Sequence, residues 1–147
     1  MRAPNDVHAV LRANGLKVTP QRDLVVRILQ DNTSHPTAES IYLAARGEQS
    51  SISLKTVYQV LHDLADIGEI QVLDLGTGAI RFDPNTSGHH HLVCTGCGTA
   101  HDVSLDTRKL VVPSKQSHGF VVEAADVVFR GRCPGCQSPH PCDPSTH

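Results

Sequence analysis

The sequence predicts an α+β chain in which an N-terminal winged helix-turn-helix domain precedes a C-terminal α/β domain built around cysteines. Apolar residues recur at helical spacing through residues 7–68, and strand-like alternation follows them. Two Cys-x-x-Cys pairs then occur in the second half of the chain. With 147 residues, 39% of them hydrophobic, the chain has room for one or two small domains.

Four helices are expected before the strand-like alternation begins. Thr19, Thr37 and Ser53 each stand where a side-chain oxygen can cap the first turn of the second, third and fourth helix. Glycines follow the first, third and fourth helices and indicate where these end: Gly15, Gly47 and Gly68. The fourth helix has a single apolar stripe formed by Val57, Val60, Leu61 and Leu64.

A hairpin is expected over residues 70–82. Ile70 and Val72, then Ile80 and Phe82, alternate with polar residues on either side of the turn at 76–78. Helices followed by a short hairpin are typical of a winged helix-turn-helix, and the helix over residues 53–66 would then enter the major groove of DNA. An ordinary three-helix core with a solvated face stays open as the alternative.

Polar side chains near the start of that fourth helix lie off its apolar stripe. Lys55 suits a phosphate contact, while Tyr58 and Gln59 suit base edges or a thymine methyl group. The net charge of the chain is -2, so no global attraction draws it to nucleic acid. Any contact with DNA must therefore come from a local patch.

The domains are expected to be residues 1–83 and 89–136, joined by a linker at 84–88 that is rich in turn-forming residues. In the second domain we expect strands at 92–94, 100–104, 120–122 and 127–129, and a short helix around 106–111. Residues 137–147 lack apolar periodicity and are predicted to be a disordered tail.

The four cysteines of the two pairs predict a structural zinc site: Cys94, Cys97, Cys133 and Cys136. Glycines in both turns (96, 98 and 135) would allow the positive φ that aims backbone N–H groups at sulfur. Packed thiols and disulfides are the alternatives, and disulfides need an oxidising compartment. The N-terminus has no signal-peptide core and no apolar run is long enough to span a membrane, so a cytoplasmic location is expected.

The three consecutive histidines indicate a second metal site of a different kind. In a strand, His89 and His91 point to one face and His90 to the other, so we expect His89 and His91 to bind together. A site of imidazoles and carboxylates without sulfur suits Fe(II), Mn(II), Ni(II) or Zn(II). Asp102 is the nearest further candidate ligand.

Five motifs together resemble the ferric uptake regulator family: the segments 15–22 and 35–39, Thr-Val-Tyr at 56–58, Arg-Phe-Asp at 81–83, and the His-x-His-x-x-Cys-x-x-Cys-Gly run at 89–98. The resemblance implies a homodimeric, metal-dependent bacterial repressor with a C-terminal dimerisation domain. It also implies a regulatory Fe(II) or Mn(II) site at the domain junction, formed by His35, Asp83, His89, His91 and Asp102.

The resemblance further implies that Lys17 enters the minor groove and that Tyr58 contacts bases. The DNA contacts expected on a double-stranded operator come from Lys17, Arg22, Lys55, Thr56, Tyr58 and Gln59. Gln59 stands where the family commonly has an arginine, which leaves the operator sequence open. Gly88 and Ala125 replace ligands of a further family site, so no third tight site is expected.

Within the family, the aspartates at 83 and 102 resemble those of the peroxide-sensing regulators. In these, bound Fe(II) reacts with hydrogen peroxide and ligand histidines are oxidised, which here would be His35 and His89. An iron-responsive or other metal-responsive repressor is the alternative. We expect no enzyme and no small-molecule substrate, because five protein ligands leave little room for one. A zinc-ribbon scaffold that binds protein would leave the histidines unused.

Overall fold

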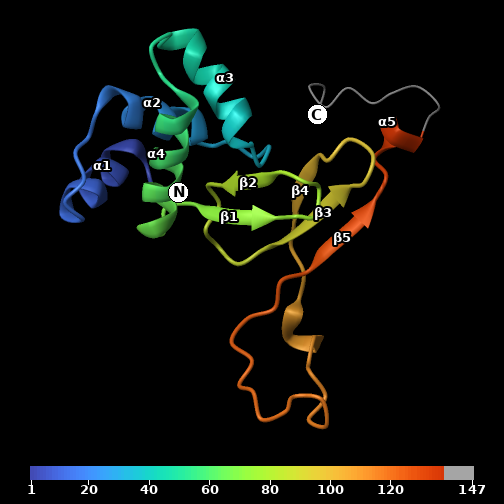
Figure 1. Ribbon diagram of the computed structural model, residues 1–147. Helices are drawn as coiled ribbons and strands as arrows, with labels where there is room; N and C mark the ends of the chain where they lie inside the picture. Colours follow the sequence, from blue (N-terminus) through green and yellow to red (C-terminus); the bar gives the residue numbers. More distant parts are fainter. Residues whose placement is uncertain (138–147) are drawn as a thin grey trace. The chain divides into compact units, whose positions relative to one another are not determined.

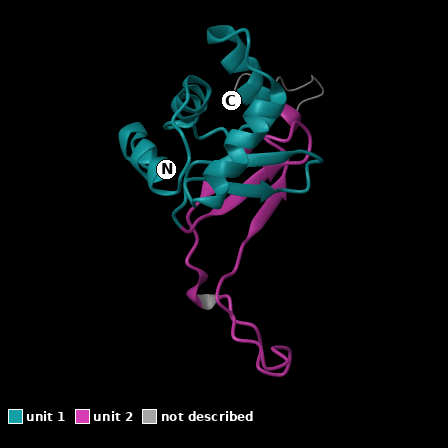
Figure 2. Cartoon of the chain, turned by 60° about the vertical axis from the view of Figure 1, so that its left-hand side comes forward, with its two compact units in different colours: residues 1–87 teal, residues 88–147 magenta. Residues whose placement is uncertain are grey.

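The computed structural model describes residues 1–137 and divides the chain into two compact units. Figure 2 colours the units, which are Met1–Ser87 and Gly88–His147. The boundary falls inside residues 84–88. Among the described residues, every helix is too short or too polar to cross a membrane. Most of the tail considered above, residues 138–147, lies outside the described residues, and Gln137 ends a short helix.

Unit 1 begins with four helices, which Figure 1 shows in chain order: α1 (Pro4–Ala13), α2 (Pro20–Leu29), α3 (Ala38–Glu48) and α4 (Leu54–Asp66). The three predicted caps are confirmed. The side chains of Thr19, Thr37 and Ser53 each accept a backbone N–H bond from the residue three positions on. The end predicted for α3 at Gly47 is wrong by one residue, because the helix includes Glu48.

The core of unit 1 lies where the apolar faces of these helices meet. All four residues of the stripe on α4 are buried, as the 3.6-residue period predicts. They pack with buried residues of the other three helices and with Phe82 of the hairpin. Each buried Val, Leu, Ile or Phe side chain contributes roughly 1.5–3 kcal/mol of hydrophobic free energy. The core therefore holds α4 in a fixed orientation, with its polar face outward.

The hairpin follows α4 as predicted. Strands β1 (Gln71–Asp74) and β2 (Ile80–Asp83) pair antiparallel, with Val72 opposite Phe82. Gly76 and Gly78 have positive φ in the connecting turn, a conformation that glycine adopts without steric cost. Helices and wing together form the winged helix-turn-helix, and the predicted α+β class is confirmed.

Unit 2 contains a three-stranded sheet in the order β4-β3-β5. The central strand β3 (His90–Cys94) pairs antiparallel with β4 (Ala100–Val103) and parallel with β5 (Val128–Gly131). A single helical turn, α5 (Pro134–Gln137), follows β5. The parallel register places Cys94 opposite Gly131. This register brings the two Cys-x-x-Cys pairs to the same end of the sheet.

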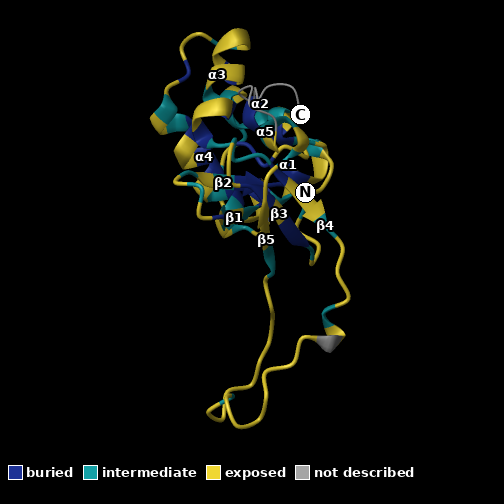
Figure 3. Ribbon diagram, turned by 90° about the vertical axis from the view of Figure 1, so that its right-hand side faces the viewer, coloured by how far each residue is buried: buried dark blue, intermediate teal, exposed yellow. Residues whose placement is uncertain are grey.

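The segment between β4 and β5 departs from the sequence prediction. The strand expected at 120–122 is wrong, because these residues have no strand partner in the described part of the chain and are exposed. Only a 3₁₀ turn, η1 (Thr107–Lys109), forms where a short helix was expected, and β4 ends at Val103 rather than Ser104. Figure 3 shows the segment as almost wholly exposed. High β propensity does not make a strand without a neighbour to receive its hydrogen bonds.

Candidate metal centres and nucleic-acid interface

The four predicted cysteines form one cluster in unit 2. Their sulfur atoms all lie within 4.8 Å of one another, and none is in a disulfide. The Sγ atoms of Cys97 and Cys133 are 3.8 Å apart. Two thiolates bound tetrahedrally to one Zn(II) at about 2.3 Å lie roughly 3.8 Å apart, so the spacing fits zinc. Four thiolates close the coordination shell, which suits a structural rather than a catalytic ion.

Backbone donors stabilise the thiolate form of Cys94. The N–H groups of Cys133 and Gly96 point at its sulfur, at 3.3 Å and 3.4 Å. Hydrogen bonds from the backbone of Cys133, Cys97 and Gly96 lower the pKa of the Cys94 thiol to about 5. Thr99, whose hydroxyl lies 3.2 Å from the sulfur of Cys97, lowers the pKa of that thiol as well. Because zinc binds thiolates, both effects favour metal binding.

The positive φ predicted for the glycines of the cysteine turns is confirmed at only one of the three positions. Gly98 does have a positive φ of 76°, but Gly96 and Gly135 do not. A Cβ added at Gly96 would lie 2.7 Å from the sulfur of Cys136. Gly96 is therefore required because the sulfur approaches its backbone closely, not because of its φ angle.

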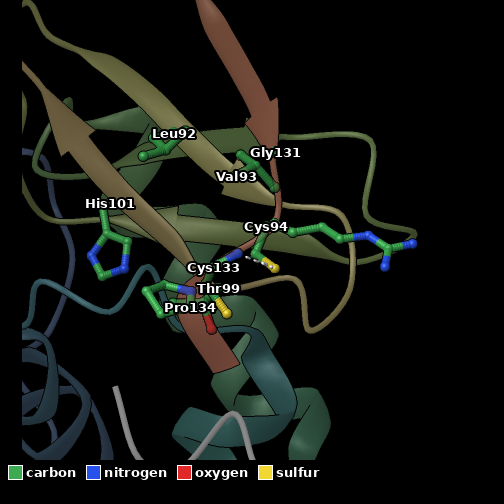
Figure 4. A pocket seen from close by; sticks show the side chains of 9 residues that line it. Leu92, Val93, Cys94, Thr99, His101, Gly131, Cys133 and Pro134 are labelled. Atoms are coloured by element: carbon green, nitrogen blue, oxygen red, sulfur yellow. Dashed lines mark hydrogen bonds between the residues drawn. The ribbon is translucent and has the colours of Figure 1, made fainter. Parts of the chain in front are cut away.

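A cavity of about 190 Å³ lies against this cluster. Figure 4 shows Cys94 and Cys133 side by side in its wall, with His101, Pro134 and the apolar side chains of Leu92 and Val93 around them. The wall is mostly apolar, and four sulfur ligands would fill the coordination shell of a zinc ion bound beside it.

Unit 1 holds two of the predicted regulatory ligands close together. His35 and Asp83 are buried, and His35 Nε2 lies 3.6 Å from Asp83 Oδ2. The other carboxylate oxygen of Asp83 accepts the backbone N–H of Asn85 at 2.7 Å. Two ligand atoms bound to the same ion at about 2.1 Å lie roughly 3.0–3.4 Å apart, so this pair is near metal-binding spacing.

Unit 2 holds the other three predicted ligands. His91 faces Asp102 across the β3–β4 pair, and His89 precedes β3. The Nε2 atoms of His89 and His91 are 3.0 Å apart, and His89 Nε2 lies 3.5 Å from Asp102 Oδ1. These three side chains therefore converge at metal-binding spacing. Imidazole and carboxylate donors of this kind suit Fe(II) or Mn(II).

His90 lies apart from this group. It is buried, and its Nδ1 accepts the backbone N–H of Val127 at 3.3 Å. His90 therefore helps to hold the start of β5 against β3.

The predicted DNA-binding side chains of unit 1 differ in their surroundings. Lys17 and Lys55 are exposed. Arg22 is only 16% exposed, and its guanidinium contacts Asp63 and donates to the backbone carbonyl of Lys17 at 2.6 Å. Asp63 also accepts a bond from Gln59 at 2.9 Å. Arg22 thus joins the segment before α2 to helix α4.

Thr56 and Tyr58 of α4 are fixed by side-chain contacts. The Thr56 hydroxyl lies 2.9 Å from that of Ser53, and the Tyr58 hydroxyl donates to Glu39 at 2.9 Å. Sequence reasoning missed Glu39 and Asp63. Glu39 is visible in the sequence only as an acid in the first turn of α3, and nothing local indicates its contact with α4.

Comparison with known proteins gives concordant results. A family model described as the ferric uptake regulator family matches residues 13–130. The peroxide-responsive repressor PerR of Staphylococcus epidermidis (strain ATCC 12228 / FDA PCI 1200) is 42% identical over 94 residues, which are 64% of this chain and 63% of that protein. The chain therefore spans less than two thirds of the length of this curated relative.

Solved structures give the same fold. The Vibrio cholerae ferric uptake regulator superimposes with a TM-score of 0.70 at 28% identity, covering 87% of this chain and 100% of that one. The Helicobacter pylori ferric uptake regulator gives a TM-score of 0.76 at 23% identity, covering 91% of each chain. At that identity the second likeness concerns the fold alone.

Proposed function

The chain belongs to the ferric uptake regulator family, and we propose that it is a metal-dependent transcriptional repressor that binds operator DNA as a homodimer and senses hydrogen peroxide. One observation carries the proposal. Each unit holds part of an imidazole and carboxylate set at metal-ligand spacing: His35 with Asp83 in unit 1, and His89 and His91 with Asp102 in unit 2.

The proposed regulatory site takes ligands from both units. Such a site couples metal to DNA binding, because all five side chains reach one ion only when the units adopt one relative orientation. A dimer binds two half-sites that have a fixed spacing on DNA. The orientation of the units that metal binding stabilises therefore decides whether both α4 helices can enter the major groove at once. Metal then acts as an effector by its higher affinity for the DNA-binding arrangement.

The peroxide response is proposed from the carboxylates at 83 and 102 and from the likeness to a peroxide-responsive repressor. Bound Fe(II) would supply the reductive cleavage of hydrogen peroxide, through which one oxygen atom is added to a ligand imidazole and water is released. His35 and His89 are the side chains expected to be oxidised. An oxidised ring is a poorer ligand, so the site loses affinity for its metal and the two units lose their fixed orientation.

The four-cysteine cluster is assigned structural zinc, which cross-links the end of β3 to the turn after β5. The DNA contacts are proposed to come from the exposed face of α4 and from Lys17. The homodimer is proposed to bury the exposed apolar side chains between β4 and β5, among them Val111, Phe120 and Val121.

Peptide mass analysis tests the proposed sensing reaction. Protein loaded with Fe(II) and protein loaded with Mn(II) are each exposed to low hydrogen peroxide. We expect the gain of one oxygen atom in the His35 or His89 peptide of the iron form alone, with loss of DNA binding. Peptides that contain the exposed His62 or His101 serve as internal controls and should remain unmodified.

The alternative outcome is equally informative. If neither ligand peptide gains oxygen and the metal stays bound, metal occupancy itself is the signal and the protein is an iron-responsive or other metal-responsive repressor. If the metal-loaded protein prefers no DNA sequence, the repressor proposal fails altogether.

A further inference from the structure

Tyr58, the residue of α4 expected to contact bases, is held by a carboxylate from a different helix. Its hydroxyl donates to Glu39 Oε1 at 2.9 Å, and the ring is 37% exposed. Glu39 belongs to the first turn of α3 and is itself exposed. Two exposed side chains on separate helices thus meet through one hydrogen bond, at the surface that is proposed to face DNA.

The carboxylate of Glu39 is fixed in turn by the start of its own helix. Its pKa is lowered by a bond from its own backbone N–H first, and then by the hydroxyls of Tyr58 and Thr37. Thr37 caps α3 by accepting the backbone N–H of Ser40 at 3.2 Å. The position of Glu39 therefore follows the position of Thr37 and the first turn of α3.

The residues just before Thr37 are bonded to the wing. The backbone N–H of Phe82 donates to the carbonyl of Pro36 at 2.9 Å, and Thr37 forms a β-bridge with Arg81. The Arg81 guanidinium donates to the carbonyl of His35 at 2.9 Å. Residues 35–37 and 81–83 consequently move together. These two segments contain His35 and Asp83, the unit 1 ligands of the proposed metal site.

His35 also constrains the backbone at this point. Its φ is +50°, which lies in the left-handed region that non-glycine residues rarely adopt. The side chain is also buried, so the ring has little room to reorient without moving its neighbours. Binding or loss of a metal ion at His35 should thus shift Thr37, the residue that caps α3.

We propose that Glu39 is a positioning residue that sets the orientation of Tyr58 for DNA recognition, and that the Pro36–Thr37 segment links this orientation to the metal ligands His35 and Asp83. The proposal rests on the repressor function argued above. It adds a connection within unit 1 between the metal ligands and the helix that is proposed to bind DNA. Through it, metal at His35 and Asp83 acts on the recognition helix of its own unit.

The negative charge of Glu39 allows a positioning role to be distinguished from a bystander role by the direction in which DNA affinity changes. A carboxylate at a DNA-facing surface repels phosphate, so removal of a bystander carboxylate should strengthen binding to every sequence. Removal of a positioning carboxylate should instead weaken binding to the operator relative to other DNA. The two roles therefore predict opposite changes for the same variant.

The probe is the duplex that Mn(II)-loaded wild-type protein selects from a randomised pool, compared with a scrambled duplex of equal composition. We expect Glu39→Ala to reduce the preference for the selected duplex roughly three- to tenfold, the range of one hydrogen bond. Glu39→Gln keeps an acceptor oxygen and should keep most of the preference. Glu48→Ala, which removes a carboxylate from the other end of α3, is the matched charge control.

A double-mutant cycle shows whether Glu39 acts through Tyr58. In a Tyr58→Phe background, Glu39→Ala should have no further effect on the preference. The positioning role is overturned if Glu39→Ala tightens binding to both duplexes equally, or if its effect persists without the Tyr58 hydroxyl. Selection of no sequence by the wild-type protein would instead overturn the repressor function itself.

The link to the metal site has its own measurement. The chain has two tyrosines, so ¹³C-labelled tyrosine gives ring signals that a Tyr42→Phe variant assigns. Filling the histidine and aspartate site with diamagnetic Zn(II) should shift the Tyr58 signal in wild-type protein. The shift should be reduced in Thr37→Val, which keeps the branched shape and loses the hydroxyl. A Tyr58 signal that does not move when the site is filled would overturn the link.

Discussion

Arg22 donates a hydrogen bond from its guanidinium to the backbone carbonyl of Lys17, 2.6 Å away, while the same group contacts Asp63 of α4. The Arg22 guanidinium therefore makes both of these contacts within unit 1. Its side chain orders the segment that carries Lys17 and so helps to place that lysine.

The Arg22 contact predicts a loss of stability. Arg22→Met keeps the aliphatic volume but leaves the largely buried Asp63 without its ionic partner, which should lower the free energy of unfolding by about 1–3 kcal/mol. Chemical denaturation of the protein measures this loss. Arg27→Met, which breaks exposed ion pairs with Asp23 and Glu48, is the control and should leave the denaturation midpoint unchanged. Equal midpoints for both variants would contradict the structural role of Arg22.

The close approach at Gly96 predicts a defect in zinc binding. In Gly96→Ala the new Cβ would lie 2.7 Å from the sulfur of Cys136, so that ligand or the turn must shift. We expect the affinity for zinc to fall roughly tenfold or more, as for other disturbed ligand geometries. Competition with a chromophoric chelator measures the affinity.

Gly131→Ala is the matched control for that experiment, because a Cβ at Gly131 meets nothing within 4 Å. It also lies in unit 2, at the end of β5. If both variants retained zinc as the wild type does, steric exclusion at Gly96 would not be the reason for a glycine there.

The Tyr58–Glu39 contact predicts a defined pH dependence. The bond raises the pKa of Tyr58, and the pKa of Glu39 is lowered, chiefly by its own backbone N–H. Ionised Glu39 therefore contributes its full stabilisation of the folded state above the ordinary carboxyl pKa. That stabilisation is lost as the pH falls through the lowered pKa of Glu39. Protonated Tyr58 contributes its full stabilisation of the folded state below the ordinary tyrosine pKa. That stabilisation is lost as the pH rises through the raised pKa of Tyr58.

Substitution of the carboxylate should reverse the shift of the phenol. We expect the pKa of Tyr58 in Glu39→Gln to fall towards the ordinary tyrosine value, because the charged acceptor is gone. Absorbance titration of the phenolate in a Tyr42→Phe background measures it, with Glu48→Gln as the control. An unchanged pKa in Glu39→Gln would show that the two groups do not interact in solution.

The exposed apolar segment between β4 and β5 predicts a dimer that a charge can break. Val121 is 86% exposed in the single chain. If a second copy covers it, Val121→Asp should shift the protein from dimer to monomer in sedimentation velocity. Leu43→Asp places the same charge on α3, where the leucine is 68% exposed, and should leave the dimer intact. A dimer that survives Val121→Asp would place the interface elsewhere.

The features that the sequence predicts correctly are those decided by neighbouring residues. Caps at Thr19, Thr37 and Ser53 depend on a side chain and an N–H three residues apart. The cysteine cluster follows from two local turns, although the parallel pairing of β3 with β5 that unites them is not visible in the sequence. Local pattern carries no information about which distant strand will supply the partner.

The features that the sequence does not predict depend on tertiary packing. The segment 120–122 has strong β propensity but finds no strand partner among the described residues, so propensity alone misleads. The contacts of Glu39 with Tyr58 and of Asp63 with Arg22 join separate helices. Such contacts require the packing of α2, α3 and α4 to be known first.

The parallel pairing of β3 with β5 bears on the order in which the chain acquires its structure. The helices of unit 1 form from residues close in sequence, whereas the sheet of unit 2 is complete only after residues 104–127 have been traversed and β5 has returned to β3. Contacts of large sequence separation form slowly, because the loop entropy is lost before the contact is gained. Unit 1 should thus fold ahead of unit 2.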